Sequence, residues 1–324
     1  MYEYGWYQWL AFFYIYCFFG WIFESTYVSV KKGHFVNRGF LRLPMLPIYG
    51  TGAVMMLWVS LPVRDSLLLV YTSGAIAATI LEYVTGWGME RLFKVKYWDY
   101  SNQRFQVNGY ICLSSTIAWG FLTVLLTEIL HPPIARYVLG IPLGVLLVCI
   151  GGITVLFVLD AVRSVKEALD LAKVLDAMTN MRAELDDLQV QMALLKAEMQ
   201  QRAAESRDES LLRLELLKSQ AEARTAALRK EASARTAALK DEAAARTTAA
   251  AEAAASRLDA WKNSAEERAA ALSRRLEEVD EKRQNLAGRM NFYRKGLLRG
   301  NPSASSARFA EALKELREMA EKRR

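Results

Sequence analysis

Residues 143–178 read LGVLLVCIGGITVLFVLDAVRSVKEALDLAKVLDAM, and within this stretch the chain changes from apolar to highly charged. Residues 1–159 hold ten Lys or Arg and seven Asp or Glu, whereas residues 160–324 hold thirty-two and twenty-eight. Because a charged side chain is costly in hydrocarbon, the two halves require different solvents. We therefore expect an all-α protein with a helical transmembrane domain at 1–159, a long coiled-coil helix at 160–287 and a basic tip with a short helix at 288–324.

Five stretches of the first half are long and apolar enough to cross a bilayer, which takes about 17 to 25 residues. They lie near residues 6–30, 46–61, 67–89, 111–130 and 135–159, with a short loop around His131 between the last two. Basic residues gather in alternate loops, at 31–43 and 90–108. The positive-inside rule then predicts a multi-pass cell-membrane protein with its N-terminus outside and its C-terminal rod in the cytoplasm.

Ionisable residues inside the predicted spans are the candidates for function, because each needs a partner or water there. With antiparallel spans, Glu24 and Glu82 fall within about two turns of the cytoplasmic face and can converge at one depth. The residues expected to form a polar pocket around them are Glu24, Arg38, Glu82, Glu90, Asp99 and Asn108, with Ser114 and Ser115 as further hydrogen-bond partners. Three interpretations stay open: a structural clamp of Arg–carboxylate pairs, a substrate or ion site, and catalysis.

A series of short motifs in the membrane half resembles a known family. The motifs are Phe19-Gly20-Trp21-Ile22-Phe23-Glu24, Val36-Asn37-Arg38-Gly39-Phe40-Leu41, Pro44-Met45-Leu46-Pro47-Ile48-Tyr49-Gly50, Leu81-Glu82-Tyr83-Val84-Thr85-Gly86, Tyr97-Trp98-Asp99-Tyr100-Ser101, Asn108-Gly109-Tyr110-Ile111-Cys112-Leu113, Trp119-Gly120 and His131-Pro132-Pro133. Together they resemble the CmpB-type family of membrane proteins labelled as ABC-transporter type IV permeases, over about residues 10–135. The resemblance implies a permease that handles a small solute or ion, and it does not extend to the rod.

An ATP-driven transporter needs a phosphate-binding Gly-x-x-x-x-Gly-Lys-[Ser/Thr] loop, and this sequence has none. An ATP-driven role therefore implies a separate ATPase subunit, and secondary transport stays open as an alternative. The alternative hypothesis is a membrane-anchored scaffold, in which the rod organises cytoplasmic partners and no solute is carried. We expect no enzymatic activity and no nucleic-acid binding, because no nucleophile–base pair and no nucleic-acid-binding motif is recognisable.

The cysteines and histidines do not predict a metal or cofactor site. Cys17, Cys112 and Cys149 lie in apolar stretches, where a free thiol behaves as a small hydrophobic side chain. His34 and His131 fall in loops predicted on opposite sides of the membrane.

No Gly or Pro occurs between residues 153 and 287, so nothing in the composition forces the predicted rod to stop. Apolar residues first recur in alternating steps of three and four, the pattern of a left-handed coiled coil. Later, an arginine recurs every eleven residues from Arg202 to Arg268, a period that predicts a straighter or slightly right-handed supercoil. The expected seam includes Leu171, Met178, Leu185, Leu188, Leu195, Leu217, Leu228, Leu239, Trp261 and Leu272.

Three arrangements fit the rod: a parallel homo-oligomeric coiled coil, a single charged helix, and a helix lying on the lipid surface. We expect the parallel homo-oligomer, because copies rooted in one membrane leave it in the same direction. Residues 160–287 carry twenty-two basic and twenty-four acidic residues, whereas a lipid-surface helix usually has a basic polar face. The tip beyond residue 288 carries ten basic and four acidic residues. We expect it to be a solvated tail or to bind an acidic partner or anionic lipid.

Overall fold

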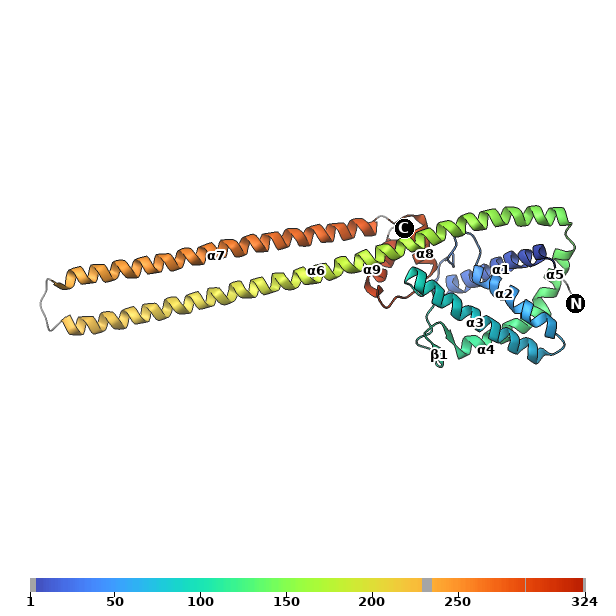
Figure 1. Ribbon diagram of the computed structural model, residues 1–324, viewed down its shortest axis with the longest axis horizontal. Helices are drawn as coiled ribbons and strands as arrows, with labels where there is room; N and C mark the ends of the chain where they lie inside the picture. Colours follow the sequence, from blue (N-terminus) through green and yellow to red (C-terminus); the bar gives the residue numbers. More distant parts are fainter. Residues whose placement is uncertain (1–3, 229–234, 289, 323–324) are drawn as a thin grey trace. The chain divides into compact units, whose positions relative to one another are not determined.

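The computed structural model describes residues 4–228, 235–288 and 290–322, and this part of the chain is almost entirely helical (Figure 1). The helices are α1 (Trp6–Lys32), α2 (Pro47–Ser60), 3₁₀ helix η1 (Leu61–Val63), α3 (Leu67–Phe93), α4 (Leu113–Leu125), π-helix η2 (Leu126–Leu130), α5 (His131–Leu139), α6 (Leu143–Leu228), α7 (Arg235–Gly288), α8 (Phe292–Gly300) and α9 (Ala310–Lys322). Two short antiparallel strands, β1 (Gln106–Val107) and β2 (Ile111–Cys112), pair Gln106 with Cys112.

The chain divides into two compact units. The first contains residues 1–179 together with 285–324, and the second contains residues 180–284. The start of the rod and the C-terminal tip both pack with the membrane half.

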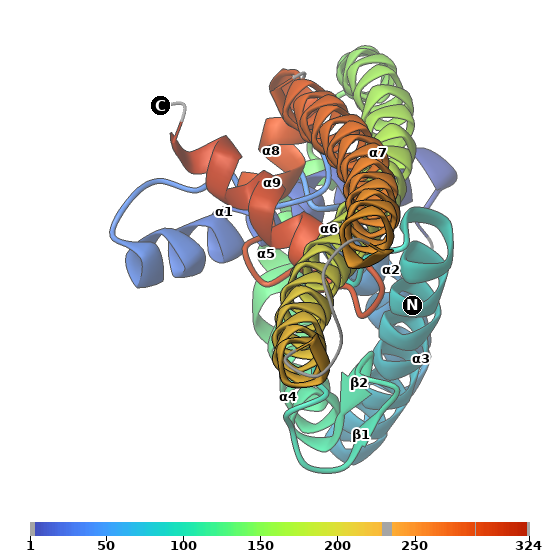
Figure 2. The same ribbon diagram turned by 90° about the vertical axis from the view of Figure 1, so that its left-hand side faces the viewer.

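Local sequence signals begin and end the helices of the first unit. Gly33 adopts φ +70° and ends α1, because a left-handed residue stops helical hydrogen bonding. Pro47 occupies the first turn of α2, where its missing N–H costs nothing. The neighbouring helices α3 and α4 run alongside each other, with β1 and β2 at one end (Figure 2).

Two glycines let α1 and α2 approach closely, and both belong to the motifs that carry the family resemblance. A Cβ at Gly50 would lie 2.6 Å from the Phe13 carbonyl oxygen and would overlap the Cys17 sulfur. A Cβ at Gly20 would overlap the Tyr49 side chain. The two helices can approach this closely only because glycine has no side chain, so they are in tight contact at Gly20 and Gly50.

Three helical stretches of the described residues are long and apolar enough to cross a membrane: Leu67–Phe93, Leu113–Leu139 and the start of Leu143–Gln220. The first predicted span is α1, which has 27 residues but many Trp and Tyr, which lower its hydropathy. The second predicted span is a shorter apolar helix, Pro47–Val63. The count of five spans is therefore not confirmed, although large apolar side chains such as Trp58 and Val148 face outward, as on a lipid-facing surface.

The expected loop around His131 is wrong. The structure continues from α4 through η2 into α5, and His131 is buried at the first position of α5. Pro132 and Pro133 sit in the first turn of that helix, where proline is tolerated. The connection to the next span lies instead around Gly140.

The second unit is a pair of helical segments that run in opposite directions. The Arg275 guanidinium lies 2.9 Å from the Glu184 carboxylate, and the Arg202 guanidinium lies 4.6 Å from the centre of the Trp261 ring. Residue numbers therefore rise along α6 as they fall along α7. An apolar cluster of Leu185, Leu188 and Val279, flanked by Met181, Leu272 and Leu276, joins the two segments (Figure 1).

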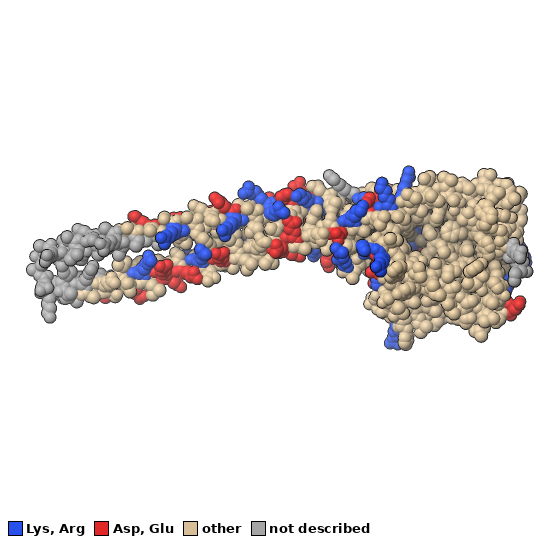
Figure 3. Space-filling model, in the orientation of Figure 1, with Lys and Arg blue, Asp and Glu red and all other residues tan. Residues whose placement is uncertain are grey.

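This arrangement differs from the single continuous helix that the sequence predicts over residues 160–287. Leu185 and Leu188 of the predicted seam pack against a later segment of the same chain. The apolar face of a heptad helix can be buried by any helix with a matching apolar face, and the later segment near Leu272 provides such a face. Leu195 is half-buried and Leu217 is exposed, whereas the side chains of Leu228 and Leu239 lie outside the described part. Figure 3 shows that charged residues cover this helix pair, whereas the visible face of the membrane helices has almost none.

We predict that Gly50→Ala lowers the thermal unfolding midpoint of the detergent-solubilised protein. The added methyl group meets the backbone of α1, and overpacking of this kind costs about 1–3 kcal/mol. Gly152→Ala is the matched control, because a Cβ there meets nothing within 4 Å. Equal losses in the two variants would contradict the close α1–α2 packing.

Candidate functional site

Glu82 is the most deeply buried carboxylate in a candidate membrane span. It lies on α3 with only 5% of its surface exposed. Its oxygens accept hydrogen bonds from Tyr100 Oη at 3.1 Å and Trp119 Nε1 at 2.9 Å, and Ser115 Oγ lies at 3.2 Å. Among the ion pairs of the described residues, none includes Glu82. A buried carboxylate is thus held by neutral donors alone.

The local fold brings these three donors to one point. Ser115 and Trp119 are four residues apart on α4, so their side chains share one face of that helix. Tyr100 comes from the loop that follows α3 and is fixed by the hydrogen bond from its backbone N–H to the Gly109 carbonyl, at 2.8 Å. Burial and, after it, the Glu82 carboxylate raise the pKa of Tyr100, so its hydroxyl keeps the proton that it donates.

Glu24 on α1 forms the second part of the site. Tyr49 of α2 donates a hydrogen bond to its carboxylate at 2.7 Å, and Arg38 forms an ion pair with it at 3.5 Å. The Tyr49 ring lies 6.5 Å from the Trp119 ring, so the partners of the two glutamates are in contact. The structure therefore places Glu24 and Glu82 in adjoining clusters, linked through aromatic side chains.

The hydrogen bonds and ion pairs described for Glu90, Asp99 and Asn108 join them to residues other than Glu82. The Glu90 carboxylate accepts a hydrogen bond from Tyr110 at 2.5 Å and lies 3.9 Å from Lys96. Asn108 donates to the Tyr83 hydroxyl at 3.1 Å. Burial and, after it, the bond to Glu90 raise the pKa of Tyr110 to about 12. These contacts hold the loop between α3 and α4 against the end of α3.

Asp99 lies in the same loop and binds serines. Its carboxylate accepts from the Ser101 backbone N–H at 2.9 Å and from the Ser305 hydroxyl at 2.9 Å. Partial burial would raise the pKa of Asp99, but the bonds from Ser101 and Ser305, with the charge of Lys96, outweigh it and lower the pKa. Asp99 is therefore a charged anchor for the C-terminal segment.

Several site residues were not predicted as partners. Tyr49, Tyr100 and Trp119 stand in the quoted motifs, but nothing in their spacing shows that they meet Glu24 or Glu82. A fourth missed residue is Asp160, whose carboxylate accepts hydrogen bonds from the backbone N–H groups of Arg42 and Leu43, both at 2.9 Å. A lone carboxylate at the end of a long apolar run was the available signal, since such a group needs donors.

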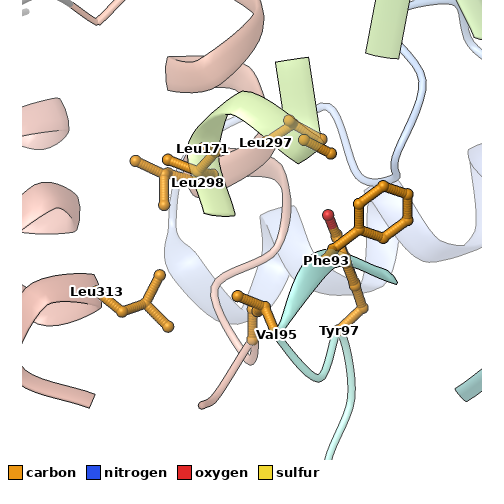
Figure 4. A pocket seen from close by; sticks show the side chains of 9 residues that line it. Phe93, Val95, Tyr97, Leu171, Leu297, Leu298 and Leu313 are labelled. Atoms are coloured by element: carbon orange, nitrogen blue, oxygen red, sulfur yellow. The ribbon is translucent and has the colours of Figure 1, made fainter. Parts of the chain in front are cut away.

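A cavity in the first unit is unsuitable for a solute. It lies between the loop after α3, the start of the rod and the C-terminal helices, and Phe93, Leu171, Leu298 and Leu313 are among its lining residues (Figure 4). Its volume is about 20 Å³, which is roughly the space for one water molecule, and its walls are apolar. The two glutamates, and not this cavity, form the candidate site.

Long apolar helices with outward-facing apolar side chains and a hydrogen-bonded carboxylate within one of them define a helical membrane protein. Residues 11–165 match the model of the CmpB family, described as "Putative ABC-transporter type IV". The resemblance drawn from the motifs is thereby confirmed. The chain matches no curated protein and no solved structure.

We predict that Trp119→Phe destabilises the membrane half. The change removes the indole N–H from Glu82 and leaves a buried carboxylate with one donor fewer, a loss of about 1–3 kcal/mol. The measurement is the thermal unfolding midpoint in detergent. Trp58→Phe is the control, because Trp58 is 71% exposed on the outer face. A midpoint no lower than that of the control would contradict the role of Trp119.

Proposed function

We propose that this chain is the membrane-embedded subunit of an ABC-type transport system and that Glu82, with Glu24, binds a small cation during transport. The observation that carries the proposal is the Glu82 carboxylate, buried within a candidate span and held by neutral donors only. Such a group retains an unneutralised charge unless a proton or another cation joins it. The family match supports transport over the scaffold alternative, because it covers the membrane half that contains both glutamates.

The arrangement of the two carboxylates supports a cation as the bound species. Glu24 already has a cationic neighbour in Arg38, whereas Glu82 has none among the described ion pairs. Two neighbouring carboxylates, of which only Glu24 has a cationic neighbour among the described ion pairs, attract a cation and repel an anionic solute.

The proposal also assigns partners and an orientation. A separate ATPase subunit supplies the energy, since no phosphate-binding loop occurs in this sequence. A second copy pairs in parallel through the exposed leucines of α6, which include Leu211, Leu212 and Leu216. The basic loops and the helix pair face the cytoplasm. Mass photometry of the purified complex tests the partners, and labelling of single cysteines with an impermeant maleimide tests the orientation.

We predict that Glu82→Gln abolishes cation flux through the native complex reconstituted in liposomes. Loss of one charge-assisted contact is worth about 1.5–3 kcal/mol, or roughly a ten- to hundredfold weaker site. The readouts are rubidium uptake and the fluorescence of an enclosed pH dye. Glu128→Gln is the matched control, because Glu128 pairs with the partly exposed Arg64 in a separate cluster. Equal flux through wild type and Glu82→Gln would contradict the proposal.

A further inference from the structure

The C-terminal tip, residues 290–322, packs on the loops that hold the two glutamate clusters. Its apolar side chains are spaced along α8 and α9 so that they share one face of each helix. Those most deeply buried are Leu297, Leu298, Phe309, Ala312, Leu313, Leu316 and Ala320. They form one core with Phe93 and Val95 at the end of α3 and with Leu171 and Leu175 of α6 (Figure 4). We call residues 290–322 the cap segment.

The positive charge of the cap segment is matched within the same chain. Arg294 lies 3.0 Å from Glu167 and 3.6 Å from Asp170, and Arg308 pairs with Asp176 at 2.5 Å. All three acids lie on the first part of α6. Two arginines of the tip thus have acidic partners within the same chain. A further acidic partner or anionic lipid at the tip stays a prediction.

The cap segment also binds Arg38 directly. The Arg38 guanidinium donates from Nη1 to the Gly300 carbonyl at 3.0 Å and to Asn301 Oδ1 at 2.9 Å. Asn301 is 4% exposed and donates in turn to the Gly39 carbonyl at 3.1 Å. The contact from Arg38 to Glu24 is longer, at 3.5 Å. One guanidinium is therefore divided between the site and the cap segment, and its shorter bonds go to the cap segment.

A second attachment joins the cap segment to the loop that carries Tyr100. Lys96 and Ser305 exchange two backbone hydrogen bonds, both at 2.8 Å. The Ser305 hydroxyl also donates to Asp99, the residue next to Tyr100. Each glutamate therefore has a partner in a loop, Arg38 for Glu24 and Tyr100 for Glu82, and the cap segment binds both of these loops.

We propose that the cap segment is a built-in regulatory device that restrains the proposed cation site when docked and releases it when undocked. Docked, it holds Arg38 beside Glu24 and fixes the loop that positions Tyr100 on Glu82. Undocked, it leaves Arg38 free to move away from Glu24, which opens that carboxylate to a cation, and it leaves the Tyr100 loop free to open. The device rests on the proposed transport function, and it lies outside the family core because the family match ends at residue 165. The start of α6 supplies the acidic partners of the cap segment, and α7 directly precedes the cap segment in the chain.

A single methyl group suffices to weaken docking. A Cβ at Gly300 would lie 2.6 Å from the Asn37 carbonyl oxygen and 3.3 Å from the Gly39 carbonyl oxygen. Because these are backbone atoms, Gly300→Ala shifts the docking equilibrium by at least about tenfold. Gly288→Ala is the matched control, since a Cβ there meets nothing within 4 Å.

A disulfide can hold the cap segment in place. A hydrogen-bonded antiparallel pair has Cα atoms about 5.5 Å apart, which suits a disulfide. Lys96→Cys combined with Ser305→Cys, with Cys149→Ser to remove the exposed native thiol, therefore forms a reversible lock. Each single cysteine variant is a control for the loss of the native side chain.

The experiment compares these proteins by hydrogen exchange in residues 36–43 and 94–101 and by rubidium flux in liposomes. We expect Gly300→Ala to raise exchange in both loops and to raise flux several-fold, and Gly288→Ala to change neither. Oxidation of the double-cysteine protein lowers flux, and dithiothreitol restores it.

Three results overturn the proposal. The first is unchanged flux despite faster exchange in Gly300→Ala or despite complete disulfide formation. If Glu82→Gln still abolishes flux in that case, the transport function is retained and the regulatory proposal is wrong. The second is flux that Glu82→Gln does not reduce, in which case the transport function fails and the regulatory device falls with it. Failure of the two cysteines to cross-link shows that the cap segment is not docked and also overturns the proposal.

Discussion

The apolar stripe formed by Ala168, Leu171, Leu175 and Met178 on α6 has to be covered, and the chain's own C-terminal segment covers it. Leu175 and Leu316 are both fully buried in this contact, and burial of such a side chain contributes about 1.5–3 kcal/mol. This contact joins the start of α6 and the C-terminal segment within the first unit.

The same contact sets the surroundings of the two glutamates. The loops after α1 and α3 each face a glutamate on one side and the cap segment on the other. A carboxylate within a candidate span can be kept there only if the loops hold their donors in place, and docking supplies that rigidity. The family core and its C-terminal extension are therefore mechanically joined through Arg38 and Asp99.

Part of this structure follows from the sequence in physical terms. The sequence alone predicts the division into an apolar and a charged half and the helical class, because charge and apolar periodicity show which surfaces face lipid, water or another helix. The family match could be predicted from the short motifs. Glu24 and Glu82 could be selected as unusual charges in apolar runs. Their convergence as a binding pocket remains a prediction, although the structure places them in adjoining clusters.

The remaining features depend on which surfaces meet, which periodicity does not encode. The heptads at Leu185 and Leu188 indicate a partner helix but do not say whether it belongs to the same chain. In the tip, the recurrence of Phe309, Leu313, Leu316 and Ala320 already describes an amphipathic helix, but the high positive charge favoured a solvated tail. Tyr49 and Trp119 look like ordinary interfacial aromatics until the fold brings them to the carboxylates.

The most direct test of the fold-back is a cross-link between the two arms of the second unit. Glu184→Cys and Arg275→Cys replace an ion pair with thiols that a short bismaleimide can bridge, in a chain that also carries Cys149→Ser. The account predicts a bridge within one chain, so that the protein keeps its monomer mass under denaturing conditions and yields one linked peptide pair from residues 184 and 275. Bridges formed only between two chains would contradict it, because the arms would then belong to separate copies.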